Sequence, residues 1–192
     1  MILFFDTETT GVPLDYNAPI TNSYNWPRLV QLAWILSDES GKEIKRKVAI
    51  IRPEGYTIPY EASTVHGITT DYALRNGQSL KVILDEFIKN VENVKLLVGH
   101  NIDFDQHIVG AELYRLGLSS DKIMHKTTIC TMKASINFCK LPPIRYGQYK
   151  WPKLQELYYK LFGHEFSNSH DALADITATK DCYYELKRRN II

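Results

Sequence analysis

The chain has 192 residues, of which 44% are hydrophobic and 23% charged, and this composition is ordinary for a soluble globular protein with one sizeable core. The net charge of +1 excludes a strong overall field for polyanions, so any attraction for nucleic acid must be local. Three cysteines without a C-x-x-C pair argue against a disulfide framework or a zinc knuckle, and no stretch is long and apolar enough to span a membrane.

The N-terminus lacks the basic segment and cleavage site of a signal peptide, so we expect an intracellular, cytoplasmic protein whose thiols are buried and free. Its first residues, 1–6, form an apolar run that predicts a buried strand. Residues 13–28 are rich in proline and asparagine and predict a long irregular loop. Residues 29–36 and 43–51 predict two further strands, which we expect to complete an antiparallel meander.

After the meander, predicted helices and strands alternate along the chain. The helices are expected near 61–66, 79–91, 104–116, 131–139, 153–162 and 171–188, and the strands at 94–98 and 128–130. This order indicates an α/β fold with a mixed sheet. No repeat, low-complexity segment or linker divides the chain, so we expect one domain over residues 1–192.

The first predicted strand ends in two acidic residues, Asp6 and Glu8. Because they are two positions apart on an extended segment, both side chains point to the same side. Turn chemistry before Thr-Thr-Gly is the alternative reading. Carboxylates on an apolar element cost free energy unless a positive charge compensates them, and hard oxygen ligands suit Mg²⁺ or Mn²⁺. We therefore interpret the pair as metal ligands.

A second acidic pair, Asp103 and Asp105, lies near the start of the helix predicted from 104. Asp103 stands three residues before Gln106, which is capping-box spacing, so we interpret it as a structural N-cap. Asp105 lies one turn before Val109 on an apolar stripe, and an acid at the buried edge of a stripe needs a compensating charge. We assign Asp105 to the metal site.

The last predicted helix begins at Asp171, and Asp175 lies beside its apolar stripe in the first turns, which points the carboxylate inward. His170 directly precedes this helix and stands five residues before Asp175, so we favour a catalytic role over a structural one. His100 follows an apolar strand instead, and we expect it to orient its loop rather than to titrate.

These blocks resemble the DEDDh family of 3′→5′ exonucleases, which includes the epsilon proofreading subunit of bacterial DNA polymerase III. Residues 6–11 match D-x-E-T-T-G, residues 100–105 match H-N-x-x-F-D, and residues 170–175 match H-D-A-L-x-D. Residues 66–69 are similar to the H-G-I-T segment of epsilon-type members. The resemblance covers nearly the whole chain and implies the ribonuclease H-like (exonuclease) fold, with a mixed five-stranded sheet flanked by helices.

The resemblance also implies a mechanism with two divalent ions, normally Mg²⁺, for which Mn²⁺ substitutes. Asp6 would bridge both ions, Glu8, Asp105 and Asp175 would complete their shells, and His170 would take the proton of the attacking water. The products would be nucleoside 5′-monophosphates. The family similarity suggests that the nucleotide pocket is lined by Thr9, Gly11, Val12, His66 and Asn101. His66 as a satisfied helix-end residue is the alternative.

Two aromatic stretches suit single-strand binding by stacking and charge: residues 145–153, which include Arg145 and Lys150, and the 13–28 loop. The slightly preferred interpretation of both is a surface loop that its aromatic side chains hold against the protein. As a hypothesis, the 145–153 loop flanks the substrate path. The 13–28 loop is long for the connection that the family needs, and its role does not follow from the sequence.

The leading functional prediction is hydrolysis of single-stranded DNA or frayed 3′ ends. An RNA-directed enzyme similar to oligoribonuclease or RNase T is one alternative, and a non-catalytic nucleic-acid-binding module is another. No segment like the polymerase-binding tail of epsilon follows the last predicted helix. We therefore expect a stand-alone enzyme, with association with a DNA polymerase as the alternative, and no membrane partner.

Overall fold

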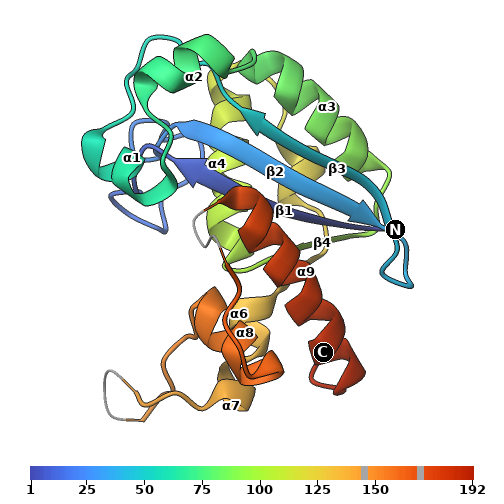
Figure 1. Cartoon of the computed structure of the whole chain (residues 1–192). Helices are drawn as coiled ribbons and strands as arrows, with labels where there is room; N and C mark the ends of the chain where they lie inside the picture. The colour runs from blue at the N-terminus through green and yellow to red at the C-terminus, as the bar shows by residue number, and fades with distance from the viewer. Residues whose placement is uncertain (144–146, 168–170) are drawn as a thin grey trace.

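The computed structural model describes residues 1–143, 147–167 and 171–192 and contains a five-stranded mixed sheet (Figure 1). The strands are β1 (Ile2–Thr9), β2 (Leu29–Ser37), β3 (Glu43–Ile50), β4 (Leu96–Gly99) and β5 (Thr128–Cys130). Their order in the sheet is β3-β2-β1-β4-β5. The first three strands pair antiparallel, whereas β4 runs parallel to β1 and β5 parallel to β4. The predicted meander and the mixed sheet are confirmed.

Nine helices lie in the described part of the chain. They are α1 (Tyr60–His66), α2 (Thr70–Asn76), α3 (Leu80–Glu92), α4 (Ile102–Arg115), α5 (Asp121–Met124), α6 (Thr131–Ala134), α7 (Ile136–Cys139), α8 (Leu154–Phe162) and α9 (Ala172–Arg188). Helices α2 and α5 were not predicted, because each buries one residue, Ala73 or Ile123, and so has no apolar stripe. The single helix predicted over 131–139 is wrong. Two short helices meet there at Ser135, whose hydroxyl donates to the carbonyl of Thr131 at 2.7 Å.

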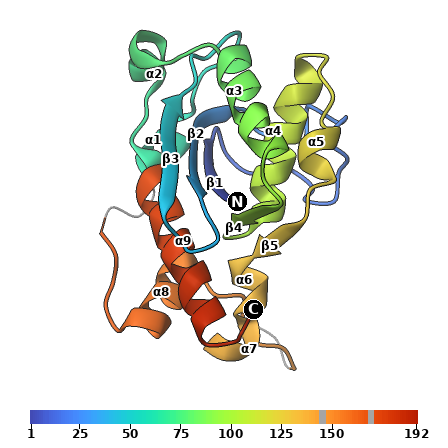
Figure 2. The same cartoon turned by 90° about the vertical axis from the view of Figure 1, so that its right-hand side faces the viewer.

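Helices cover both faces of the sheet, with α9 on one face and α3 and α4 on the other (Figure 2). Adjacent residues of β1 pack against helices on opposite faces of the sheet. The Phe4 ring lies 5.4 Å from that of Tyr183 on α9, and the Phe5 ring lies 5.2 Å from that of Phe87 on α3. Because side chains alternate along a strand, the even-numbered residues at the end of β1 face α9, and Thr7 faces the opposite layer.

The parallel pairing of β1 with β4 brings their carboxyl ends to the same edge of the sheet. In α/β folds this edge is where ligand sites form. The residues that follow β4, from His100 into α4, therefore lie beside the end of β1. Residues 13–28 follow β1 and form turns without a helix or strand of their own, which confirms the predicted loop.

The three cysteines are free, and Cys139 and Cys182 are buried as predicted, whereas Cys130 is only half-buried. Within residues 1–143, 147–167 and 171–192, none of the helices has the length and apolar character needed to cross a membrane.

Candidate active site

Three carboxylates meet where β1 ends beside the first turns of α9. Asp6, Glu8 and Asp175 each offer an oxygen, and these oxygens all lie within 4.8 Å of one another. The strand alternation places the first two on the α9 face. Asp171 starts that helix by accepting a hydrogen bond from the backbone N–H of Leu173 at 2.8 Å, which sets Asp175 one turn along.

The electrostatics of this group favour a bound cation. Burial raises the pKa of Asp6 well above its ordinary value, and the surrounding carboxylates raise it further. Burial and the charge of Asp175 raise the pKa of Glu8 from 4.5 to about 8. A divalent cation between these oxygens would relieve both effects, and an all-oxygen donor set fits a hard ion.

Asp105 approaches the group from α4, on the opposite layer. Its side chain is 3% exposed, and its Oδ1 accepts hydrogen bonds from the backbone N–H of Thr7 at 2.9 Å and from the Thr7 hydroxyl at 2.6 Å. Burial raises its pKa to about 7, and the two Thr7 bonds oppose that rise. Asp105 adds to the rise in the pKa of Asp6, so it lies within electrostatic range of the three acids. It does not belong to the 4.8 Å group itself.

The predicted N-cap role of Asp103 is wrong. Helix α4 starts earlier, from Asn101, which adopts a left-handed conformation with φ 70°. Asp103 therefore lies in the first turn, where it forms an ion pair with Lys133 on α6. Gln106, the expected capping-box partner, instead donates its side-chain amide to the carbonyl of Ile123 at 2.6 Å.

His100 connects the end of β4 to the segment before α8. Its Nε2 lies 3.0 Å from the carbonyl oxygen of Pro152, which can only accept, so Nε2 carries the hydrogen. Nδ1 then accepts from the Thr131 hydroxyl at 3.0 Å. Burial lowers the pKa of His100 to about 4, so the ring is neutral near pH 7. Its geometry agrees with the predicted orienting role.

A cavity of about 360 Å³ opens beside the acids, lined by Asp6 and Asp175 together with His100, Met132, Trp151 and Lys153. The tryptophan belongs to the stretch that suited single-strand binding, and 54% of it is exposed. Met132 comes from α6, and no sequence signal connected that helix with the acids. Lys150 forms an ion pair with Glu156, so its charge is partly neutralised.

The structure brings together some of the residues expected to line the nucleotide pocket. The Thr9 hydroxyl donates to the carbonyl of Gly11 at 2.6 Å, and Val12 is 69% exposed. His66 ends α1, and its Nδ1 accepts from the backbone N–H of Ile68 at 3.1 Å, as the helix-end alternative requires. Burial lowers the pKa of His66, whereas the backbone of Thr9 raises it. Thr9 therefore lies near His66.

Three expected participants fall outside the described residues. His170, the predicted general base, lies in the segment 168–170, and Arg145 and Tyr146 lie in 144–146.

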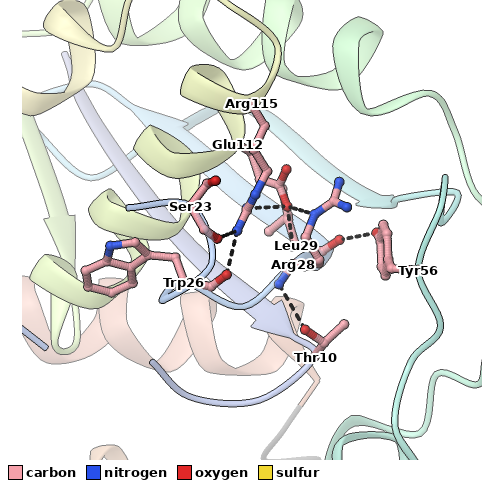
Figure 3. Close-up of polar contacts among 8 residues, drawn as sticks. All are labelled: Thr10, Ser23, Trp26, Arg28, Leu29, Tyr56, Glu112 and Arg115. Atoms are coloured by element: carbon pink, nitrogen blue, oxygen red, sulfur yellow. Dashed lines mark hydrogen bonds and ion pairs between the residues drawn. The ribbon is translucent and has the colours of Figure 1, made fainter. Parts of the chain in front are cut away.

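The 13–28 loop is fastened to α4 by a buried ion cluster that the sequence did not indicate (Figure 3). Glu112 is fully buried, and its Oε1 accepts from Nε of Arg28 at 2.8 Å and from the backbone N–H of Leu29 at 2.9 Å. Arg115 completes the ion cluster with an N–O distance of 3.1 Å to the same oxygen. The Arg28 guanidinium also lies 4.1 Å from the centre of the Tyr56 ring.

Two further sets of bonds hold the ends of the loop. Arg115 donates to the carbonyls of Ser23 and Trp26 at 2.5 Å each, and both contacts are visible in Figure 3. At the start of the loop, Thr10 and Arg28 exchange two bonds. The backbone N–H of Thr10 donates to the Arg28 carbonyl at 3.0 Å, and the Arg28 N–H donates to the Thr10 hydroxyl at 2.9 Å. The segment after β1 is therefore fixed at both ends.

Comparison with known proteins agrees with this geometry. A family model described as an exonuclease (RNase_T) matches residues 3–183. Human three-prime repair exonuclease 1 is 24% identical over an alignment 202 residues long. The alignment covers 92% of this chain and 60% of the human protein.

Solved structures show the same fold. E. coli exonuclease I in complex with a dT13 oligonucleotide has a TM-score of 0.78 at 24% identity, covering 98% of this chain and 41% of that one. The moderately thermophilic exonuclease I from Methylocaldum szegediense has a TM-score of 0.76 at 21% identity, covering 98% of this chain and 40% of that one. This chain therefore spans less than two thirds of the length of each of these relatives.

Proposed function

The chain belongs to the DEDDh family of 3′→5′ exonucleases, and from this premise we propose that it hydrolyses single-stranded DNA from the 3′ end to nucleoside 5′-monophosphates in a metal-dependent reaction. The observation that carries the proposal is the group of three carboxylates with oxygens within 4.8 Å. Burial raises the pKa values of Asp6 and Glu8, and a clustered group of carboxylates is stabilised by bound cations. Paired divalent cations hydrolyse phosphodiesters. DNA as the substrate is supported by the E. coli relative, which was solved with a dT13 oligonucleotide.

The residues divide the chemistry among them. Asp6, Glu8 and Asp175 would hold two Mg²⁺ ions, with Mn²⁺ as a substitute, and Asp105 would complete the shell while Thr7 orients it. Bound ions of this kind lower the pKa of a coordinated water and stabilise the leaving 3′-oxygen. His170 takes the proton of the attacking water on its imidazole, whose ordinary pKa lies near operating pH.

The remaining residues position the substrate. His100 stays neutral and holds Pro152, and with it the neighbouring Trp151, at the edge of the catalytic cavity. Thr9, Gly11, Val12, His66 and Asn101 form the proposed contacts to the terminal nucleotide. The backbone of Thr9 acts on the pKa of His66, which supports placing both residues in one pocket.

The test is a gel assay on a 5′-labelled single strand of DNA and on RNA of the same sequence, with Mg²⁺, Mn²⁺ or EDTA. We expect a ladder of products that shortens from the 3′ end with either metal and disappears in EDTA. Faster cleavage of the RNA strand would instead favour the exoribonuclease alternative. No cleavage of either strand with either metal would refute the proposal.

A pair of variants on α9 tests the assignment to the acids. Asp175→Asn removes a carboxylate of the group and should lower the single-turnover rate by at least about 1,000-fold, because metal stabilisation of the transition state contributes several kcal/mol. Asp181→Asn removes a carboxylate from the same helix outside the group and should keep the rate. Equal rates for the two variants would contradict the assignment.

A further inference from the structure

A second cavity, of about 720 Å³, lies between the 13–28 loop and the head of α4, and we call it the aromatic cleft. Its lining includes Tyr16 and Trp26 from the loop, Phe104 and His107 from α4, Met132 from α6, and Trp151. The volume falls within the roughly 300–1,000 Å³ that small-ligand pockets occupy. None of the residue roles proposed above uses the loop side of this cleft.

The aromatic cleft adjoins the catalytic cavity. Met132 and Trp151 line both of them, so the cleft shares these two wall residues with the space beside Asp6 and Asp175. A strand whose terminal phosphodiester lies at the acids must continue away from them in its 5′ direction. The cleft offers that continuation.

Its walls are suited to flat apolar groups. Tyr16 is 57% exposed, and the centre of its ring lies 6.5 Å from that of Phe104. The exposed Trp151 adds another ring at the boundary. The buried Trp26 ring stacks on His107 with centroids 4.9 Å apart and planes 27° from parallel, so it forms a fixed wall. Aromatic side chains bind successive bases of a single strand by stacking, with little dependence on sequence.

The cleft carries little net charge. Its lysine, Lys133, is paired with Asp103, which also lines it. A site for phosphates would present unpaired positive charge, whereas this one presents rings and the side-chain amides of Asn17 and Asn101. The chemistry therefore fits bases better than the phosphate backbone.

The loop wall is held in place by contacts within the protein. Arg115 holds the carbonyls of Ser23 and Trp26, and Glu112 holds Arg28, so the buried ion cluster fixes the loop against α4. A wall that is fixed in advance avoids the ordering cost that a mobile loop would incur on binding. This gives the unusually long 13–28 loop a role.

We propose that the aromatic cleft binds the unpaired nucleobases immediately 5′ of the nucleotide that is removed, with Tyr16 as a stacking residue. The inference rests on the proposed exonuclease function. It predicts that the enzyme reads a single-stranded segment through its bases and not only through the terminal nucleotide.

The test compares Tyr16→Ala with Tyr24→Ala. Tyr24 belongs to the same loop, is 98% exposed and does not line the cleft, so its variant controls for loss of an aromatic ring from the loop. The substrates are a DNA strand and a matched strand in which the three nucleotides 5′ of the terminal one lack bases. On the normal strand, Tyr16→Ala should raise KM by about 5- to 100-fold, as expected for one lost stacking contact, and Tyr24→Ala should not.

The abasic strand supplies the decisive comparison. On the abasic strand, the KM of wild type should rise, and the KM of Tyr16→Ala should be close to that of wild type. Tyr16→Phe should have the KM of wild type on both strands. Equal KM values for Tyr16→Ala and Tyr24→Ala on the normal strand, with kcat retained, would overturn the cleft assignment and leave the exonuclease function standing. Absence of cleavage of both strands by wild type would instead refute the proposed function.

Discussion

The charge of Glu8 should destabilise the metal-free protein, and its removal should stabilise it. Glu8→Gln keeps the shape of the side chain but removes the negative charge that the other carboxylates oppose. Because the variant also removes a proposed metal ligand, we expect Mg²⁺ to stabilise it much less than it stabilises wild type. Stability and metal dependence therefore give separate readouts of one substitution.

The magnitude follows from the pKa of Glu8, which rises from 4.5 to about 8 in the folded protein. Each unit of difference between the folded and unfolded states corresponds to about 1.36 kcal/mol. Well below pH 4.5, Glu8 is neutral in both the folded and the unfolded state, so it does not change the free energy of unfolding. As pH rises to 8, the unfolded state ionises first, so the folded state loses relative stability. Between pH 5 and pH 8.5 the loss amounts to about 4 kcal/mol at most, since rearrangement and water entry reduce it.

The assay is urea unfolding in EDTA at pH 5 and pH 8.5, for wild type, for Glu8→Gln and for a control, Glu39→Gln, in the exposed turn after β2. We expect Glu8→Gln to gain stability over wild type at pH 8.5 and to gain little at pH 5, while the control follows wild type at both. Addition of Mg²⁺ at pH 8.5 should stabilise wild type much more than Glu8→Gln. A wild-type-to-variant difference that stays the same at both pH values would refute the reasoning.

Two further predictions concern Glu112 in the ion cluster and His100 beside the catalytic cavity. Glu112→Gln should lower the free energy of unfolding in urea by about 3–5 kcal/mol, because it leaves Arg28 and Arg115 without the carboxylate that they share, and equal stability would contradict the importance of the cluster. His100→Gln should lower kcat without moving the acidic limb of the pH–rate profile, because the pKa of His100 is about 4 and the ring does not titrate near neutrality. A shift of that limb in the variant would show that His100 takes part in proton transfer.

The elements that the sequence predicted well are those with a periodic or continuous apolar signal. The run at the start of the chain gave β1, and the predicted strand at 128–130 coincides with β5. The alternation along β1 also correctly predicted that Asp6 and Glu8 share one side. The buried position of Asp105 followed from its place on the α4 stripe, and its exposed fraction of 3% confirms that inference.

The features that escaped prediction depend on contacts between distant segments or on unusual backbone geometry. Arg28 and Glu112 are 84 residues apart, and neither has a local pattern that connects it with the other. The start of α4 was misplaced because Asn101 adopts a left-handed conformation, which capping statistics do not anticipate. Met132 reaches the acids only because α6 packs beside them. Lining residues of this kind cannot be found from a single sequence.

The most direct test of the metal assignment counts the ions that the protein binds. Titration with Mn²⁺, followed by the electron paramagnetic resonance signal of the free ion, should show two saturable sites per chain in wild type in the presence of a non-hydrolysable single strand. Asp6→Asn should lose both, since Asp6 is the proposed bridge between them. Equal binding by wild type and Asp6→Asn, or no saturable binding by wild type, would contradict the account.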